Sequence, residues 1–362
     1  MSAARPLTIG FAIPGDLSTP TGGYRYDRMV MDGLGAFGIS VIHVPLSARY
    51  PAPDQDTRHA TADLIRHTKV DLWLVDGLAF GAFGPVELAA FTVPVIALVH
   101  HALCDETGID ADTAAGLLAS EKQALASAKA VIVTSPQTAD RVHHLFGLSA
   151  DRVHVAVPGV VIPKLIEDQP RDRLALLCVG SVSPRKGYDL LVAALAPLQG
   201  RAWHLNIAGR LDDRDTTESL RRQIDQSGLA GHITLCGALD DAALETLWAS
   251  HDVLIFPSRY EGYGMVLTEA LAHGLAVLCS DQVPAAEGLP APAVTRLGVE
   301  DRHSWTRHIG AWLATPSLVR TARQSARNTA SLLPQWRDTA AGIAKIVHDL
   351  SQSVKPSNGP AQ

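Results

Sequence analysis

The sequence lacks the features that mark several classes of protein. Its apolar runs fall well short of the roughly 18 residues that cross a bilayer. Its four cysteines lie at least 40 residues apart without a Cys-x-x-Cys pair, so neither a zinc ribbon nor a disulfide framework is indicated. No expected strand is followed by Gly-x-Gly-x-x-Gly, which disfavours a nicotinamide-dinucleotide enzyme.

Positive charge is also scarce. Lys plus Arg number 31 against 37 Asp plus Glu, a net charge of −6, which argues against nucleic-acid binding but leaves room for a small anion pocket. Residues 1–15 predict a first strand and its turn, not a signal peptide. We therefore expect a cytoplasmic protein. Peripheral contact with the inner face of a membrane stays open, on a modest patch of Arg25, Arg28 and His143-His144.

What is present is an alternation of short apolar runs with helix-like stretches. The 362 residues, 47% of them hydrophobic, suffice for two domains with sizeable cores. The runs show little period-two alternation, as expected of parallel strands covered on both faces. They span residues 7–13, 41–44, 72–75, 95–99 and 131–134, then 174–180, 204–208, 233–236, 253–256 and 276–279.

This order predicts an α/β protein with two Rossmann-like domains that face each other across a cleft. We expect the first domain over 1–165 and the second over 172–332, with a charged, proline-containing linker near 163–171. A last helix over 333–353 is expected to return to the first domain, and the tail 354–362 is expected to be disordered.

The most specific motif runs from Phe256 to Ala270, Phe-Pro-Ser-Arg-Tyr-Glu-Gly-Tyr-Gly-Met-Val-Leu-Thr-Glu-Ala. A buried strand is expected to end at Phe256, and a helix is expected to begin near Met265 or Val266. The unpaired amides of a helix N-terminus suit a phosphate. Two glycines of the loop let a ligand approach the backbone closely: Gly262 and Gly264.

Two glutamates eight residues apart flank this loop, Glu261 within it and Glu269 inside the helix. Carboxylates there can accept hydrogen bonds from sugar or ribose hydroxyls. The motif and its setting resemble those of retaining glycosyltransferases of family 4, which have the GT-B fold. Their mark is Glu, seven residues and Glu in a Glu-Gly-(Phe/Tyr)-Gly context. The resemblance extends over nearly the whole chain.

The resemblance implies an enzyme that moves a hexose from a UDP- or GDP-sugar to an acceptor hydroxyl with retention. It places the reaction in bacterial glycan, polysaccharide or glycoconjugate biosynthesis. Retaining members are thought to use front-face attack assisted by the leaving phosphate, so no dedicated protein base is implied. The nucleotide sugar is a substrate, and no cofactor is expected.

A second motif, Gly180-Ser-Val-Ser-Pro-Arg-Lys-Gly, follows the first strand of the second domain. Its two basic residues, Arg185 and Lys186, would neutralise a diphosphate. The family has Gly-Arg-x-x-x-x-Lys-Gly here, and Lys186 falls on its lysine, whereas Ser181 stands at its arginine. We infer that Arg185 supplies the second cation, with Arg210 or Arg259 as further candidates.

In the first domain, the pair Gly22-Gly23 predicts a turn whose amides wrap around an anion, although glycine pairs alone are a weak signal. The family carries a similar Gly-Gly loop over the donor diphosphate. His100 follows the expected strand 95–99, at the edge where open α/β sheets bind ligands. In the family a histidine at this place contacts the transferred sugar, so His100 takes that role, with His101 in reserve.

No metal is expected. The acidic clusters Asp212-Asp213 with Asp215, and Asp240-Asp241, are interpreted as helix caps. Two alternatives stay open: a nucleotide-sugar-binding protein without catalysis, which Ser181 would allow, and a GT-B UDP-sugar 2-epimerase. A phosphorylase would need a lysine for pyridoxal phosphate, and this sequence offers no obvious candidate. The acceptor, the donor base and the oligomeric state are not readable from the sequence.

Overall fold

The computed structural model describes residues 6–164 and 171–353. It divides into two compact units, Met1–Gly159 with Pro334–Gln362 (unit 1) and Val160–Leu333 (unit 2). The expected tail 354–362 and residues 165–170 of the expected linker lie outside the described residues.

Unit 1 is built on a parallel six-stranded sheet with the order β2-β1-β3-β4-β5-β6. The central strands are apolar and buried on both faces, as the lack of alternation predicts. The strands are β1 (Leu7–Pro14), β2 (Ile39–Leu46), β3 (Leu72–Asp76), β4 (Val95–Val99), β5 (Ala130–Val133) and β6 (Val153–Val155). The helices are α1 (Gly22–Leu34), α2 (Gln55–His67), α3 (Gly77–Phe80), α4 (Pro85–Leu88), α5 (Ala111–Ser127), α6 (Pro136–Phe146) and α13 (Trp336–Ser353).

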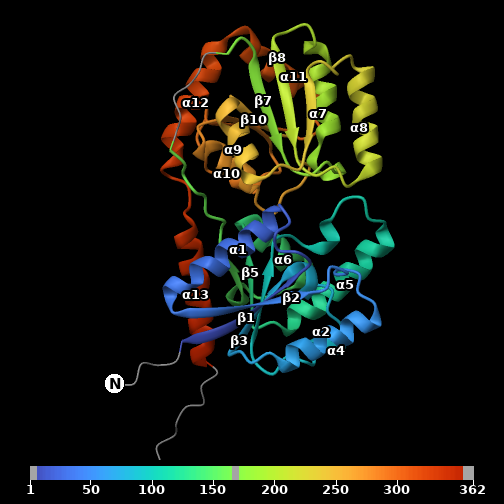
Figure 1. The fold of residues 1–362 in the computed structure, drawn as a ribbon, viewed down its shortest axis with the longest axis vertical. Coiled ribbons are helices and arrows are strands. Elements are labelled where there is room, and N and C mark those ends of the chain that lie inside the picture. Colours follow the sequence, from blue (N-terminus) through green and yellow to red (C-terminus); the bar gives the residue numbers. More distant parts are fainter. Residues whose placement is uncertain (1–5, 165–170, 354–362) are drawn as a thin grey trace, which may run out of the picture. The chain divides into compact units, whose positions relative to one another are not determined.

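Helix α13, drawn red at the lower end of Figure 1, belongs to unit 1 although it follows unit 2 in the chain. It lies beside α1. The ring of Trp336 meets the ring of Tyr26 edge-on at 5.7 Å between centroids, and Thr339 donates a hydrogen bond to the carbonyl of Val157 at 2.7 Å. Unit 1 is therefore assembled from both ends of the chain.

Unit 2 is built on a second parallel six-stranded sheet, whose strand order β12-β11-β10-β7-β8-β9 differs from that of unit 1. Its strands are β7 (Leu174–Val179), β8 (Trp203–Ala208), β9 (Ile233–Gly237), β10 (Val253–Phe256), β11 (Ala276–Ser280) and β12 (Val294–Leu297). Its helices are α7 (Tyr188–Leu195), α8 (Arg214–Gln226), α9 (Asp241–Ser250), α10 (Met265–Ala272), α11 (Arg302–Ala314) and α12 (Pro316–Ala330). Two parallel α/β sheets are thus confirmed.

Both acidic clusters are helix caps, as predicted. Asp213 accepts a hydrogen bond from the amide of Thr216 at the start of α8, and Asp240 accepts one from the amide of Ala243 at the start of α9. Each carboxylate satisfies an amide that the first helical turn leaves unpaired.

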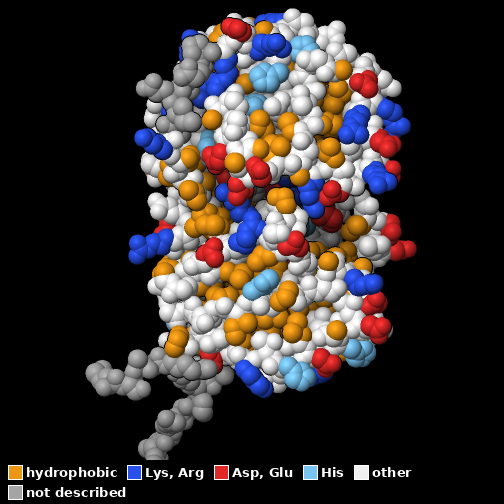
Figure 2. Space-filling model, in the orientation of Figure 1, with side chains coloured by type: hydrophobic (Ala, Val, Ile, Leu, Met, Phe, Trp, Pro, Cys, Tyr) orange, Lys and Arg blue, Asp and Glu red, His pale blue; other side chains and the backbone are white. Residues whose placement is uncertain are grey.

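The surface carries mixed charge. On the face drawn in Figure 2, Lys and Arg side chains are interspersed with Asp and Glu instead of gathering into one basic patch. Within 6–164 and 171–353, no helix combines the length and apolar character needed to cross a membrane.

Candidate active site

The loop before α10 needs glycine at its end. Gly264 caps α10 with φ +98°, a left-handed conformation that L side chains rarely adopt. A Cβ there would lie 2.7 Å from Cγ1 of Val283 and 3.1 Å from the ring of Phe256. The helix begins at Met265, as predicted, so Met265 and Val266 contribute the amides of its first turn.

Glu261, in the same loop, lies between two cations. Its Oε1 is 2.6 Å from Nζ of Lys186, and its Oε2 is 3.2 Å from a guanidinium nitrogen of Arg185. Burial alone would raise the pKa of Glu261, but Lys186 first and Arg185 second hold it at about 2. Glu261 is therefore ionised at neutral pH. We call Arg185, Lys186 and Glu261 the Glu261 cluster.

Sheet topology brings this cluster together from positions about 75 residues apart. Strands β7 and β10 are neighbours, so the turn after β7 meets the loop after β10 at the carboxyl edge. Gly187 allows the two segments to approach closely. It has φ +66°, and a Cβ there would lie 2.2 Å from the carbonyl oxygen of Pro257. Nζ of Lys186 also lies 5.1 Å from the ring centroid of Phe256, within cation–π range.

Arg185 also binds to the backbone of the loop before α10. It donates to the carbonyl of Tyr260 at 2.8 Å as well as pairing with Glu261. Arg259 is paired with Asp189 at 2.8 Å and with Glu300 at 3.1 Å. Lys186 contacts the carboxylate of Glu261 and lies over the ring of Phe256.

The remaining predicted residues of unit 2 lie around the same loop. Gly262 follows Glu261 in a bend, and Glu269 is in α10 with only 8% of its surface exposed. A buried carboxylate has lost its hydration and needs a polar partner, unlike a solvated glutamate on a helix surface. The assignment of Glu269 to a ribose stays a prediction.

His100, directly after β4, lies between two carboxylates. Its Nε2 is 3.2 Å from Oδ1 of Asp27 and 3.4 Å from Oδ2 of Asp76. Asp76 ends β3 and caps α3 through the amide of Leu78, while Asp27 is on α1 and wholly buried. The ring of Tyr26 packs edge-on against the imidazole at 5.3 Å. We call Asp27, Asp76 and His100 the His100 cluster.

The carboxylates decide the charge of this imidazole. Burial would lower the pKa of His100, but Asp27 and then Asp76 raise it to about 10. Burial, reinforced by Asp76, in turn raises the pKa of Asp27 to about 7. The three ligating atoms lie within 4.8 Å of one another, a spacing also found in metal sites. Nε2 is hydrogen-bonded to Asp27 and ion-paired with Asp76, and we interpret the group as an ion-paired cluster.

The expected Gly22-Gly23 loop is wrong. Both glycines are helical, as the first residues of α1, because Thr21 caps the helix and accepts a hydrogen bond from the amide of Tyr24. A Cβ on Gly23 would lie 3.4 Å from Cδ2 of His100, so the first turn of α1 lies against the imidazole. The pair still offers amides, but as a helix N-terminus.

Sequence reasoning missed Asp27 and Asp76. A signal existed for Asp76, since a carboxylate ends an otherwise apolar strand beside the strand that leads to His100. Asp27 gave less: it shares the buried face of α1 with Val30 and Leu34, where a polar residue is unexpected.

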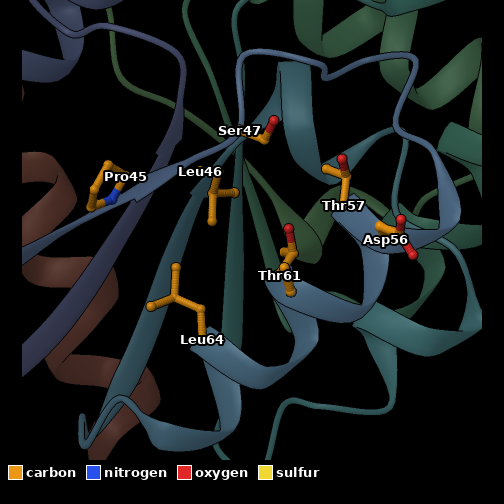
Figure 3. Close-up of a pocket in the computed structure, with 8 residues that line it drawn as sticks. Pro45, Leu46, Ser47, Asp56, Thr57, Thr61 and Leu64 are labelled. Carbon is orange, nitrogen blue, oxygen red and sulfur yellow. The ribbon is translucent and has the colours of Figure 1, made fainter.

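A shallow groove of unit 1 lies apart from these residues (Figure 3). It has a volume of about 380 Å³ and runs between the end of β2 and α2. In the close-up, Leu46 and Leu64 supply carbon surface, and Ser47 and Thr57 carry oxygen atoms at the other end. It contains none of the predicted site residues.

Known proteins resemble the chain in both units. The family model for a glycosyl transferase 4-like domain matches residues 15–159, and that for glycosyl transferases group 1 matches residues 164–329. The MMP alpha-(1->4)-mannosyltransferase of Mycolicibacterium hassiacum is 25% identical over 73% of this chain and 67% of its own length. The GDP-mannose-dependent alpha-(1-6)-phosphatidylinositol monomannoside mannosyltransferase of Mycolicibacterium smegmatis is 25% identical over 86% of this chain and 84% of its own.

Solved structures agree on the fold. HepE of Anabaena in complex with UDP-glucose superposes with a TM-score of 0.76 at 16% identity, over 95% of this chain and 100% of that one. Other glycosyltransferase structures match over similar lengths. The chain spans less than half the length of some other curated relatives that it matches. With two family models that together cover most of its length, the chain belongs to the group 1 glycosyl transferases and is a glycosyltransferase of the GT-B fold.

Proposed function

We propose that this glycosyltransferase moves a hexose from a UDP- or GDP-sugar to an acceptor hydroxyl of a bacterial glycan or glycoconjugate, with retention and without a metal. The observation that carries the proposal is the Glu261 cluster beside the first turn of α10. Two cations and helix-terminal amides suit a diphosphate. Support for the donor class comes from relatives, one named as GDP-mannose-dependent and one crystallised with UDP-glucose.

The chemistry asks the protein mainly for electrostatics. The bond from the anomeric carbon to the phosphate oxygen breaks, and a bond from that carbon to the acceptor oxygen forms on the same face. The acceptor's proton passes to the departing phosphate oxygen, and a nucleoside diphosphate leaves. Lys186 and Arg185 would balance the charge that grows on this leaving group, where one well-placed donor is worth roughly 3–4 kcal/mol.

The other residues would hold the two ends of the donor. Glu261, kept ionised by its two cations, accepts hydrogen bonds from hydroxyls of the transferred sugar. Glu269 takes the ribose hydroxyls. His100 contacts the transferred sugar, and Gly22, Gly23, Gly262 and Gly264 keep backbone accessible to the donor.

The test is incubation with radiolabelled UDP-glucose and GDP-mannose, with thermal shifts over a wider panel of nucleotide sugars. A ligand that binds only the native state raises its apparent stability. We expect slow hydrolysis of one donor, loss of that hydrolysis in Glu261→Gln, and release of the sugar with the donor's anomeric configuration. Stabilisation by a nucleotide sugar without turnover would indicate a binding protein. A product epimerised at C2 would indicate an epimerase. A sugar released with the inverted anomeric configuration would overturn retention.

A further inference from the structure

Asp27 is a buried acid that no part of the proposed chemistry uses. It lies on α1 with 0% of its surface exposed, and its Oδ1 accepts a hydrogen bond from Nε2 of His100 at 3.2 Å. Its Oδ2 is buried and has no hydrogen-bond partner among residues 6–164 and 171–353. A carboxylate in such a place is costly unless a cation compensates it. The cation available to it is the imidazolium of His100.

The contacts with the two acids also fix which edge of the imidazole ring points into the protein. Asp27 and Asp76 both engage Nε2, one from α1 and one from the end of β3. The His100 side chain is 21% exposed, and the other ring nitrogen, Nδ1, is left as the atom that can engage a ligand. Nδ1 donates a hydrogen bond when the ring is charged and accepts one when the ring is neutral with its proton on Nε2. The charge of His100 therefore decides what kind of ligand atom it can hold.

We propose that Asp27 is a positioning residue for His100, which it keeps oriented and charged through Nε2 so that Nδ1–H donates to an oxygen of the sugar donor. Only the identity of that ligand rests on the proposed function. The oxygen must be an acceptor, such as that of a sugar hydroxyl, and the donated hydrogen bond is charge-assisted and hence strong.

The surroundings of the imidazole support this assignment. From α1 come Asp27 and Tyr26, from β3 comes Asp76, and after β5 the hydroxyl of Thr134 donates to the carbonyl of His100 at 3.3 Å. The two acids raise the pKa of His100 to about 10, against the effect of burial. Burial, with Asp27 as the next cause, raises the pKa of the Tyr26 phenol, so that group stays neutral.

The test compares the titration of His100 in the native protein and in Asp27→Asn. This substitution keeps an oxygen that can accept from Nε2 but removes the negative charge. With ¹³C,¹⁵N-labelled histidine, assigned by loss of the signal in His100→Gln, NMR should show native His100 charged up to at least pH 8.5. In Asp27→Asn, its pKa should fall by one unit or more. Asp32→Asn, an exposed acid on the same helix, should leave the titration unchanged.

Kinetics add a readout that a merely structural role would not give. For Asp27→Asn, kcat/KM on the donor identified above should fall several-fold at pH 8.5 and return towards the native value at pH 6, where the ring is charged again. An equal loss at every pH would overturn the proposal. So would a native His100 that titrates near its ordinary pKa, a result that needs no variant to fold. If no donor is turned over but His100 stays charged, the proposed function fails and the Asp27–His100 pair stands.

Discussion

The two units of this glycosyltransferase carry ion clusters of opposite composition. In the Glu261 cluster one acid lies between two cations, and in the His100 cluster one potential cation lies between two acids. The first keeps a net positive charge after its internal pairing, which suits a phosphate. The second has no positive charge to spare, so it suits an uncharged group such as a sugar hydroxyl. Two six-stranded parallel sheets thus support two different kinds of polar contact.

Both clusters form where neighbouring parallel strands end. Lys186 follows β7 and Glu261 follows β10, while Asp76 ends β3 and His100 follows β4. Unit 1 differs because a third partner comes from a helix, Asp27 on α1. The comparison can be tested by removing one charge at a time.

The largest effect should come from Lys186→Ala. We expect kcat/KM to fall by about 10²–10³, because the variant loses the cation nearest Glu261 and with it a preorganised partner for the leaving diphosphate. Steady-state kinetics with the best donor measure this. Lys122→Ala, at an exposed position of α5, is the matched control. A fall of less than threefold would remove Lys186 from the phosphate site.

Glu261→Gln should come next, and it should separate catalysis from nucleotide binding. We expect transfer to fall by on the order of 10²-fold, while affinity for the free nucleoside diphosphate stays the same or improves. The reason is that the variant frees Lys186 and Arg185 from a competing carboxylate. Calorimetric titration with UDP and GDP supplies the second half of the test.

The variant matched to Glu261→Gln is Glu269→Gln, which should weaken affinity for the nucleotide if the Glu269 carboxylate holds the ribose. Equal losses of transfer and of nucleotide affinity in Glu261→Gln would contradict the assignment of Glu261 to the sugar.

Arg185→Ala should have a smaller effect than Lys186→Ala, about tenfold in kcat/KM. The guanidinium lies 3.2 Å from Oε2 of Glu261 and donates a hydrogen bond to the carbonyl of Tyr260, which holds it within the protein and away from a diphosphate. Adding Ser181→Arg to this variant should recover activity by supplying a cation where the family has one. If Arg185→Ala is silent, the second cation must be sought elsewhere, beginning with Arg210.

The smallest effect should follow treatment with a metal chelator. We expect activity to survive excess EDTA, because Asp213 and Asp240 are occupied as helix caps and Nε2 of His100 is engaged by Asp27 and Asp76. Loss of activity that Mn²⁺ or Mg²⁺ restores would show that one of these acidic groups binds an ion. The His100 cluster would then be the first place to look.

The sequence predicted the loop before α10 and ten of the strands well, because both depend on local pattern, but it missed the edge strands β6 and β12. Continuous apolar runs mark buried parallel strands, and a Gly-rich segment between a strand and a helix marks a helix N-terminus. It predicted the beginning of α1 poorly. A glycine pair is typical of a turn, but here Thr21 precedes it and caps the helix.

Partners distant in sequence were harder to foresee. The pairing of Lys186 with Glu261 depends on β7 and β10 being neighbours, which no local pattern reveals. Asp27 meets His100 only because α1 packs with one face towards the sheet. Amphipathic periodicity identifies that face, but it does not say which buried polar side chain on it will find a partner.

The position of α13 has a consequence for synthesis. All 174 residues of Val160–Leu333 leave the ribosome between the two parts of unit 1, which takes roughly 10–30 seconds at common translation rates. During that time α1 lacks the helix that packs beside it, and Tyr26, the neighbour of Asp27, lacks the ring of Trp336. A nascent chain therefore contains the whole of unit 2 before α13 is made and can pack beside α1, so unit 2 can fold while unit 1 still lacks one of its helices.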